Sequence, residues 1–310
     1  MTDRVDQLHE DILAGPAALQ RLLDAYDSSD SPLARVMPAL RAHPRIAFTG
    51  LGSSRYAASI AATALRASGA SAWVEYASTG APTAPAPNLT MVAVSASGRT
   101  PEVVAAARRH RGRSFVIAVT NDPDSALAAE ADEVMPLHAG TEGSGIATRT
   151  FRATVALLAM IAGRTPASLA GTVAELATAF EGRKRWLSDM ADAFDGASAI
   201  DVLADAAILG LADQAALMLR EAPRLPATAH DTGDWLHTAV YLALPGHRAL
   251  LFPGAAADAE VIATIERRGG VVVSTPGPVD ADPFRRVMVD SVCAEILAVE
   301  LWRRTSSAED

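Results

Sequence analysis

The first half of the chain alternates short apolar runs with stretches of helical periodicity. Each run is apolar along its whole length and is followed by turn-forming residues or a helical stretch. Strands of this kind are typical of a parallel sheet whose two faces are both covered by helices. The pattern therefore predicts an α/β fold with a mostly parallel sheet. The expected strands are residues 46–49, 72–76, 90–94, 115–119 and 133–137, and the expected helices are 57–67, a helix from 101 onward and 127–131.

The second half repeats this order. Residues 207–212 are expected to form a strand followed by a helix, and the series over 248–274 matches the series over 89–119. The offset of roughly 160 residues indicates a domain duplication rather than a short-period repeat array. The expected organisation is a helical leader over 1–44, a first α/β domain over 45–165, a connecting helix over 166–195 and a second α/β domain over 196–310.

Two loops rich in hydroxyl groups and glycine follow expected strands of the first domain. The segment 95–100, Ser-Ala-Ser-Gly-Arg-Thr, precedes a helix that begins at Pro101, which Thr100 can cap. The free amides and the positive end of that helix then face the serines, which makes an anion site without basic residues. The segment Gly52-Ser-Ser54 can add hydroxyls from a neighbouring strand end. Either loop alone would be an ordinary turn, but two at adjacent strand ends favour a phosphate or sulfate site.

Composition and charge exclude several classes of function. The 310 residues are 50% hydrophobic and 20% charged, which provides a sizeable core. The net charge of −9 argues against a dedicated binder of nucleic acid or of anionic membranes. A single cysteine, Cys293, forbids an intrachain disulfide and a multi-cysteine metal site, and we expect neither a metal nor a cofactor. No signal peptide and no apolar run long enough for a membrane helix is visible in the sequence, so a cytoplasmic location is expected.

A dinucleotide site remains an alternative at the first loop. Gly50 and Gly52 match the first two glycines of a Rossmann fingerprint, and Glu75 stands near the position of its acidic residue. Arg55 occupies the place of the third glycine. The sequence therefore supports this alternative less well than the anion site.

Four segments resemble the SIS (sugar isomerase) family, in particular the isomerase part of glucosamine-6-phosphate synthase and the stand-alone phosphosugar isomerases and deglycases. The segments 50–57 and 95–100 are similar to the Cys-Gly-Thr-Ser and Ser-Gln-Ser-Gly-Glu-Thr loops of that family. The segment 142–151 resembles its Glu-x-x-Val-Ala-Ser-Thr-Lys-x-Phe motif, and residues 10–19 resemble its leader. The likeness spans nearly the whole chain. It implies two SIS domains, each a three-layer αβα sandwich with a flavodoxin-like sheet.

The resemblance also implies roles for individual residues. A sugar phosphate is the expected partner, and a homodimer is expected because the family completes its site across subunits. Ala96 stands where the family has a phosphate-binding glutamine, and the glutaminase half of the synthase is expected to be absent. The implied phosphate-binding residues are Ser54, Ser95, Ser97 and Thr100, and the implied sugar-contacting residues are Ser53, Ala147 and Thr148.

Proton transfer is the step for which the match is incomplete. Aldose–ketose isomerisation requires a base that moves a proton between C1 and C2 and an acid that opens the ring. By the resemblance, His237 matches the ring-opening histidine of the family, but Ala227 and Thr228 stand where its catalytic glutamate is expected, and its C-terminal lysine is not matched. Glu221 and Asp234 are then the nearest acids that could assist His237. The polar residues over 230–237 could equally be capping and surface groups.

Two functions follow from these observations. The first is an enzyme, either a phosphosugar isomerase or an amino-sugar-phosphate deaminase or deglycase. The alternative is a catalytically silent regulatory protein that binds a sugar phosphate.

Overall fold

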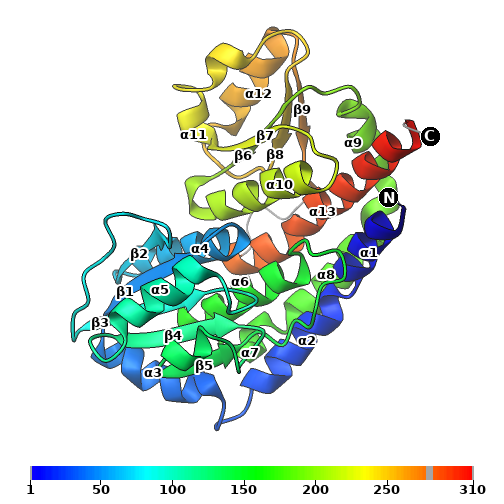
Figure 1. Ribbon diagram of the computed structural model, residues 1–310. Helices are drawn as coiled ribbons and strands as arrows, with labels where there is room; N and C mark the ends of the chain where they lie inside the picture. The colour runs from blue at the N-terminus through cyan, green and yellow to red at the C-terminus, as the bar shows by residue number, and fades with distance from the viewer. Residues whose placement is uncertain (1, 277–281, 309–310) are drawn as a thin grey trace. The chain divides into compact units, whose positions relative to one another are not determined.

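The computed structural model describes residues 2–276 and 282–308, and the chain forms two compact units (Figure 1). The five-stranded unit consists of Pro16–Thr141 and Arg149–Val173. The four-stranded unit consists of Met1–Gly15, Glu142–Thr148 and Ala174–Asp310. Each is therefore built from segments that are separated in the sequence.

The five-stranded unit contains a parallel sheet with the strand order β2-β1-β3-β4-β5. This order reverses direction between β1 and β3, as in flavodoxin-like folds, and such reversals are where α/β sheets bind ligands. The strands are β1 (Arg45–Gly50), β2 (Ser71–Tyr76), β3 (Leu89–Val94), β4 (Phe115–Thr120) and β5 (Glu133–Pro136). The helices are α2 (Gly15–Tyr26), α3 (Pro32–Ala42), α4 (Ser53–Ala67), α5 (Pro101–His110), the 3-10 turn η1 (Ala128–Glu130), α6 (Arg149–Ile161) and α7 (Pro166–Leu169).

Helices cover both faces of this sheet. Ala47, Met91 and Ala118 belong to a buried cluster that includes Val103 and Ala107 of α5. Nearly all side chains of the three central strands β1, β3 and β4 are buried, and α4 packs on β1 and β2 as well as on α6. Because both faces are covered there, these three strands are mostly apolar along their whole length rather than at every second position. The predicted parallel sheet is confirmed.

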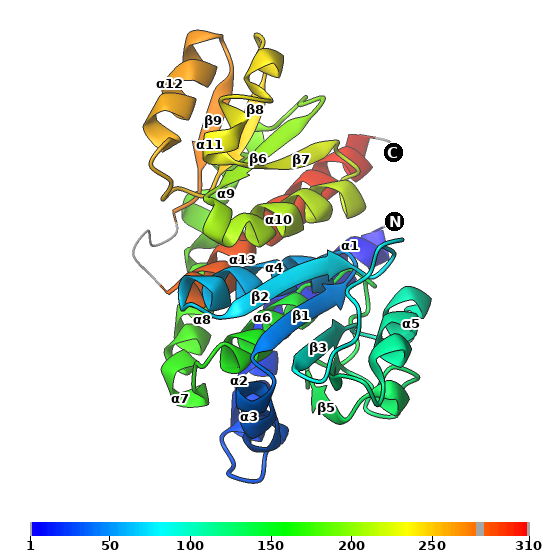
Figure 2. The same ribbon diagram turned by 90° about the vertical axis from the view of Figure 1, so that its left-hand side faces the viewer.

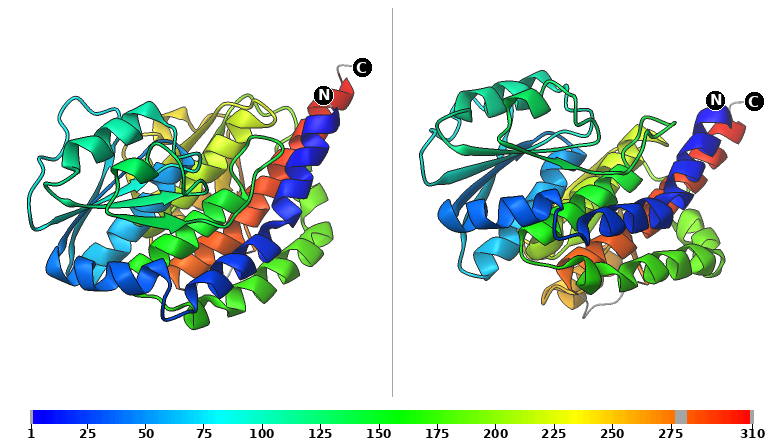
Figure 3. Two further views of the ribbon diagram at one scale, coloured as in Figure 1. Left: turned by 60° about the horizontal axis from the view of Figure 1, so that its bottom comes forward. Right: turned by 90° about the horizontal axis from the view of Figure 1, so that it is seen from below.

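The four-stranded unit has the parallel order β7-β6-β8-β9, which corresponds to the first four positions of the other sheet. Helices α11 and α12 lie on one side of its strands and α10 on the other (Figure 2), and α1 runs beside α13 (Figure 3). The strands are β6 (Ile200–Ala204), β7 (Ala227–Asp231), β8 (Arg248–Leu251) and β9 (Val271–Ser274). The helical elements are α1 (Thr2–Leu13), most of α8 (Gly171–Gly182), η2 (Arg183–Arg185), α9 (Leu187–Ala193), η3 (Ala206–Ile208), α10 (Leu209–Glu221), α11 (Thr232–Trp235), η4 (Val240–Leu242), α12 (Asp258–Arg267) and α13 (Pro283–Ala308).

Two local predictions are wrong. Residues 207–212, expected as a strand, lie in η3 and α10, and β6 lies before them at Ile200–Ala204. The continuous connecting helix expected over 166–195 is divided into α7, α8, η2 and α9, because Thr165 starts a new helix with a capping box and glycines stand at both ends of α8. No helix in the part of the chain that the structure describes is both long enough and apolar enough to cross a bilayer.

Candidate functional site

The loop over residues 95–100 begins directly at the end of the buried strand β3. Ser95 donates its backbone N–H to the Val119 carbonyl of β4 (3.0 Å), and the Gly98 N–H bonds the Ser95 carbonyl (3.0 Å), which closes a tight turn. Gly98 has a φ of 63°. A Cβ at this position would lie 2.0 Å from the Ser125 Oγ, so only glycine fits. Local geometry therefore fixes the path of the loop.

Three hydroxyl groups lie on this loop. Ser95 is buried, and its Oγ lies 3.0 Å from the Thr100 Oγ1. Ser97 is exposed, and its Oγ accepts from the Arg99 N–H (3.2 Å). Thr100 stands at the N-cap position of α5, as predicted, but its side chain makes no capping hydrogen bond. Since Pro101 has no N–H, the next amides at the start of α5 carry the positive end of the helix dipole beside these hydroxyls.

The second loop lies at the end of the neighbouring strand. In the β1–β3 register Thr49 is opposite Ala93, so the residues that follow each strand are neighbours too. A Cβ at Gly50 would lie 3.1 Å from both the Ser54 Cβ and the Val94 carbonyl oxygen. Ser53 and Ser54 begin α4 with half-buried side chains. The structure thus brings the two predicted loops together at the point where the strand order reverses.

A third loop supports this site and was not singled out by sequence reasoning. The Thr120 Oγ1 donates to the Ala96 carbonyl (3.2 Å), and the Asn121 N–H bonds the same oxygen (2.9 Å). Asp122 forms an ion pair with the exposed Arg99 (3.0 Å), so the only basic residue of the first loop is already neutralised. The sequence signal is that Thr120-Asn-Asp122 directly follows an apolar strand that is parallel to β3.

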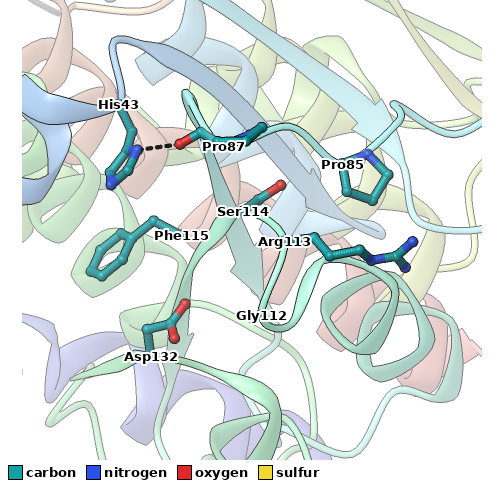
Figure 4. Close-up of a pocket in the computed structure, with 8 residues that line it drawn as sticks. All are labelled: His43, Pro85, Pro87, Gly112, Arg113, Ser114, Phe115 and Asp132. Carbon is teal, nitrogen blue, oxygen red and sulfur yellow. Dashed lines mark hydrogen bonds between the residues drawn. The ribbon is translucent and has the colours of Figure 1, made fainter.

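A cavity of about 600 Å³ lies at the amino ends of the strands of the five-stranded sheet (Figure 4). The His43 ring stacks on Phe115 with its Nδ1 donating to the Pro87 carbonyl (2.6 Å), and Asp132 accepts from the Val116 N–H (2.7 Å). Because His43 and Phe115 lie where strands begin, this cavity is far from the hydroxyl loops along the strand direction. Its polar groups serve the fold.

Residues 142–148 belong to the four-stranded unit and are held by three separate side chains. The Glu142 carboxylate accepts from both the N–H (2.6 Å) and the hydroxyl (2.8 Å) of Thr148. The Asp11 carboxylate accepts from the Ser144 N–H (2.9 Å), and the Gln214 Nε2 donates to the Ala147 carbonyl (2.9 Å). The Thr148 side chain is fully buried and already bonded, whereas Ala147 is partly exposed. Contact of these two residues with a sugar stays a prediction.

The three predicted catalytic residues lie at the ends of α10 and α11. Glu221 is the last residue of α10, where burial of its carboxyl raises its pKa and the charge of Arg220 partly offsets this. The Asp234 carboxylate accepts from the Thr238 hydroxyl (3.3 Å), and His237 is exposed one turn after α11 begins. Among the described residues, no side-chain hydrogen bond or ion pair joins these three groups. Their catalytic roles stay predictions.

A buried polar cluster that the sequence does not predict lies beneath α11. The Asp201 carboxylate of β6 accepts from the Trp235 Nε1 (2.7 Å) and lies 3.5 Å from the His230 Nε2 and 3.3 Å from the His247 Nε2. Burial alone would raise the pKa of Asp201, but the nearby imidazoles of His230 and His247 and the hydrogen bond from the Trp235 indole hold it well below its usual range. An acid within the apolar strand 200–204 is the signal that could have located this cluster.

Comparisons with known proteins show what the chain resembles. Residues 39–164 match the family model of the SIS domain. A glutamine–fructose-6-phosphate aminotransferase (isomerizing) of Aeropyrum pernix is 35% identical over 174 residues, which cover 51% of this chain and 28% of that enzyme. The chain therefore matches less than a third of the length of this relative.

Two solved structures share the fold over nearly the whole chain. The C-terminal domain of glucosamine-fructose-6-phosphate aminotransferase from Francisella tularensis has a TM-score of 0.85 at 17% identity and covers 97% of this chain and 96% of its own. Tagatose-6-phosphate ketose/aldose isomerase from Escherichia coli has a TM-score of 0.80 at 18% identity, and the match covers 97% of this chain and 94% of the isomerase chain. At such identities the likeness shows the fold.

Proposed function

We propose that the protein binds a sugar phosphate at the two hydroxyl loops of its five-stranded unit, since residues 39–164 match the family model of the SIS domain. The observation that carries this proposal is the loop 95–100, in which Gly98 holds Ser95, Ser97 and Thr100 at the positive end of α5. Backbone amides, hydroxyl groups and a helix dipole bind phosphate without requiring a basic side chain.

The phosphate is proposed to accept hydrogen bonds from Ser54, Ser95, Ser97 and Thr100. Three of these hydroxyls lie on one turn after β3. Ser54 lies in the first turn of α4, which follows β1, at the same carboxyl end of the sheet. The sugar ring is proposed to contact Ser53, Ala147 and Thr148. Arg99 contributes little charge, since its guanidinium is paired with Asp122.

The reaction is proposed to be an aldose–ketose isomerisation or the release of nitrogen from an amino-sugar phosphate. His237 would open the ring, and Glu221 or Asp234 would move the proton between C1 and C2. The raised pKa of Glu221 supports this role, because a base is most effective when its pKa approaches the working pH. The names of the similar enzymes, which act on fructose 6-phosphate and tagatose 6-phosphate, support the substrate class.

The phosphate site is tested by calorimetric titration with fructose 6-phosphate, glucosamine 6-phosphate and unphosphorylated fructose. We expect the two phosphates to bind and fructose not to bind. The double variant Ser97→Ala/Thr100→Ala is expected to bind the phosphates about 100-fold more weakly, since each hydrogen bond to a charged group contributes about 1.5 kcal/mol. Ser188→Ala, an exposed serine of α9, is the control and should bind normally. Unchanged affinity in the double variant would refute the site.

A silent regulatory protein is the second candidate. It is favoured by Ala227 and Thr228, which begin strand β7 where the resemblance leads us to expect a catalytic glutamate and which carry no carboxylate. The two candidates are distinguished by incubating the protein with each sugar phosphate in D₂O and following deuterium at C2 by NMR. Exchange supports the enzyme, and binding without exchange supports the regulator. A cytoplasmic homodimer is part of the proposal for either, and light scattering tests the dimer.

A further inference from the structure

A cavity of about 780 Å³ lies between α8 and α13 in the four-stranded unit. This volume falls within the range of pockets that enclose small ligands. Most of its lining is apolar, and the residues that matter here are Ala179, Trp186, Val289, Asp290 and Cys293. All of them belong to the four-stranded unit and are separate from the loops 50–54 and 95–100.

Asp290 places a buried carboxylate in the wall of this cavity. Its side chain is 1% exposed, and its Oδ2 accepts from the Arg286 Nε (3.1 Å). Its Oδ1 is buried and has no hydrogen-bond partner among the residues that the structure describes. A buried oxygen left in this state costs about 1–3 kcal/mol, which a ligand that donates a hydrogen bond to it would recover.

Among the charged groups around the cavity, the Asp290 Oδ1 is a buried acceptor that no described residue bonds. Glu175 is paired with Arg285, and Arg286 divides its donors between Asp290 and the Pro253 carbonyl. Arg185 lines the cavity with an exposed side chain. The Cys293 thiol has its pKa raised by burial and by the negative charges of Asp290 and Glu295, so it remains protonated.

We propose that this cavity binds a small molecule that joins an apolar body to a protonated amine, with the amine donating to the Asp290 Oδ1. The apolar body lies against Val289 and Cys293, and the Trp186 ring can contact either the body or the cation through its π face. The site is independent of the proposed sugar-phosphate site.

The protonation of Asp290 sets the pH range of binding. Burial, partly offset by Arg286, raises the pKa of Asp290 to about 6. The carboxylate is therefore ionised at pH 8 and largely protonated at pH 5. Amine binding should therefore weaken as the pH falls through 6. The other charged groups around Asp290 are Glu175 and Arg185 in the cavity lining and Arg286, which is paired with Asp290.

The proposal is tested with 2-phenylethylamine and its neutral analogue 2-phenylethanol, titrated into the full chain at pH 8 and followed by ligand-observed NMR. We expect the amine to bind at least tenfold more tightly than the alcohol. Asp290→Asn should abolish this preference, whereas Asp189→Asn, an exposed carboxylate on α9, should retain it. Equal affinity for the two probes, or no binding of the amine at millimolar concentration, would overturn the proposal.

A second variant covers the case in which Asp290→Asn does not fold. Ala179 is half-buried in the cavity wall, so Ala179→Phe fills the space without removing a charge. The folded variant should lose the binding of 2-phenylethylamine. Binding that persists unchanged in Ala179→Phe, with a native circular-dichroism spectrum, would place the amine elsewhere and reject the cavity.

Discussion

Gly98 meets two constraints that exclude every side chain. Its φ of 63° lies in the left-handed region, and the space where a Cβ would stand is filled by Ser125 and by the Thr120 hydroxyl. Gly112 shares the first constraint, with a φ of 69°, but has no atom within 4 Å of its Cβ position. Substituting each glycine therefore distinguishes the free-energy cost of a left-handed backbone conformation, which both positions share, from the cost of a steric clash, which arises only at Gly98.

Substitution of these glycines by alanine gives the first stability prediction. Gly112→Ala should lower the free energy of unfolding by about 1 kcal/mol, the cost of a left-handed alanine. Gly98→Ala should lower it by about 2 kcal/mol more, because the Cβ must displace Ser125, and it should also weaken the binding of fructose 6-phosphate. Urea titrations of both variants provide the measurement. Equal losses would show that Ser125 moves aside freely.

At the residue scale, sequence reasoning succeeds for groups whose partners are local. The turn 95–100 is predicted correctly because its glycine, proline and hydroxyls act within a few positions of one another. Asp201 and His247 are not predicted, since they meet only when β6 and the residues before β8 are placed side by side. The Asp11 carboxylate lies 133 positions from Ser144 and leaves no pattern in the sequence that would pair them.

At the scale of elements, α11 is too short to be stable alone and depends on its side-chain partners. The Asp231 carboxylate caps it by accepting from the Asp234 N–H (2.9 Å), and the fully buried Trp235 joins it to Asp201 of β6. The sequence suggests capping residues here but places the first strand of the second domain at 207–212 instead of at β6. That error arises because 207–212 is more apolar than β6, in which Asp201 interrupts the run.

Removal of the Asp201 charge should weaken the attachment of α11 to β6, and the resulting loss of stability should depend on pH. The folded pKa of Asp201 is lowered, so its ionised form stabilises the folded state at neutral pH, and this contribution is lost as the pH falls below about 4 towards the folded pKa. Asp201→Asn should therefore lower the free energy of unfolding by about 2 kcal/mol at pH 7, with a smaller difference at pH 3. The measurement is urea unfolding at both pH values.

Asp195→Asn, an exposed carboxylate before β6, is the matched control and should behave like the unsubstituted protein. A difference between Asp201→Asn and the unsubstituted protein that stays constant from pH 7 to pH 3 would contradict the assigned role of the charge.

At the scale of the whole molecule, segments of the two units alternate along the chain. The four-stranded unit takes its first helix from residues before the five-stranded unit and the segment 142–148 from the middle of it. Arg4 and Asp11 of α1 bond this segment, and α1 in turn packs on α13. The fold class could be predicted from the periodicity of apolar residues, but the alternation of segments between the two units could not. Periodicity indicates which residues are buried, and it does not indicate which other residues they pack against.

Hydrogen exchange measures how strongly α1 holds the segment 142–148. Asp11→Ala should accelerate exchange of the Gly143 and Ser144 amides about tenfold, since their shared acceptor is lost. Exchange in the loop 95–100 should be unchanged. Asp6→Ala, on the same helix and paired with Arg303 at the surface, is the control. No change at residues 143 and 144 in Asp11→Ala would show that other contacts determine the protection of the segment.

The position of the segment 142–148 has a consequence for the order in which a nascent chain acquires its parts. The hydrogen bonds that close the loop 95–100 join residues no later than Leu127, so that loop can form early in synthesis. When the segment 142–148 is synthesised, its partner Asp11 is already present in the chain. The hydrogen bond from Gln214 to the Ala147 carbonyl can form only after Gln214, 67 positions later, has been synthesised. At roughly 5–20 residues per second, that interval lasts roughly 3 to 13 seconds. The proposed phosphate loop is therefore complete on the ribosome well before the segment proposed to meet the sugar.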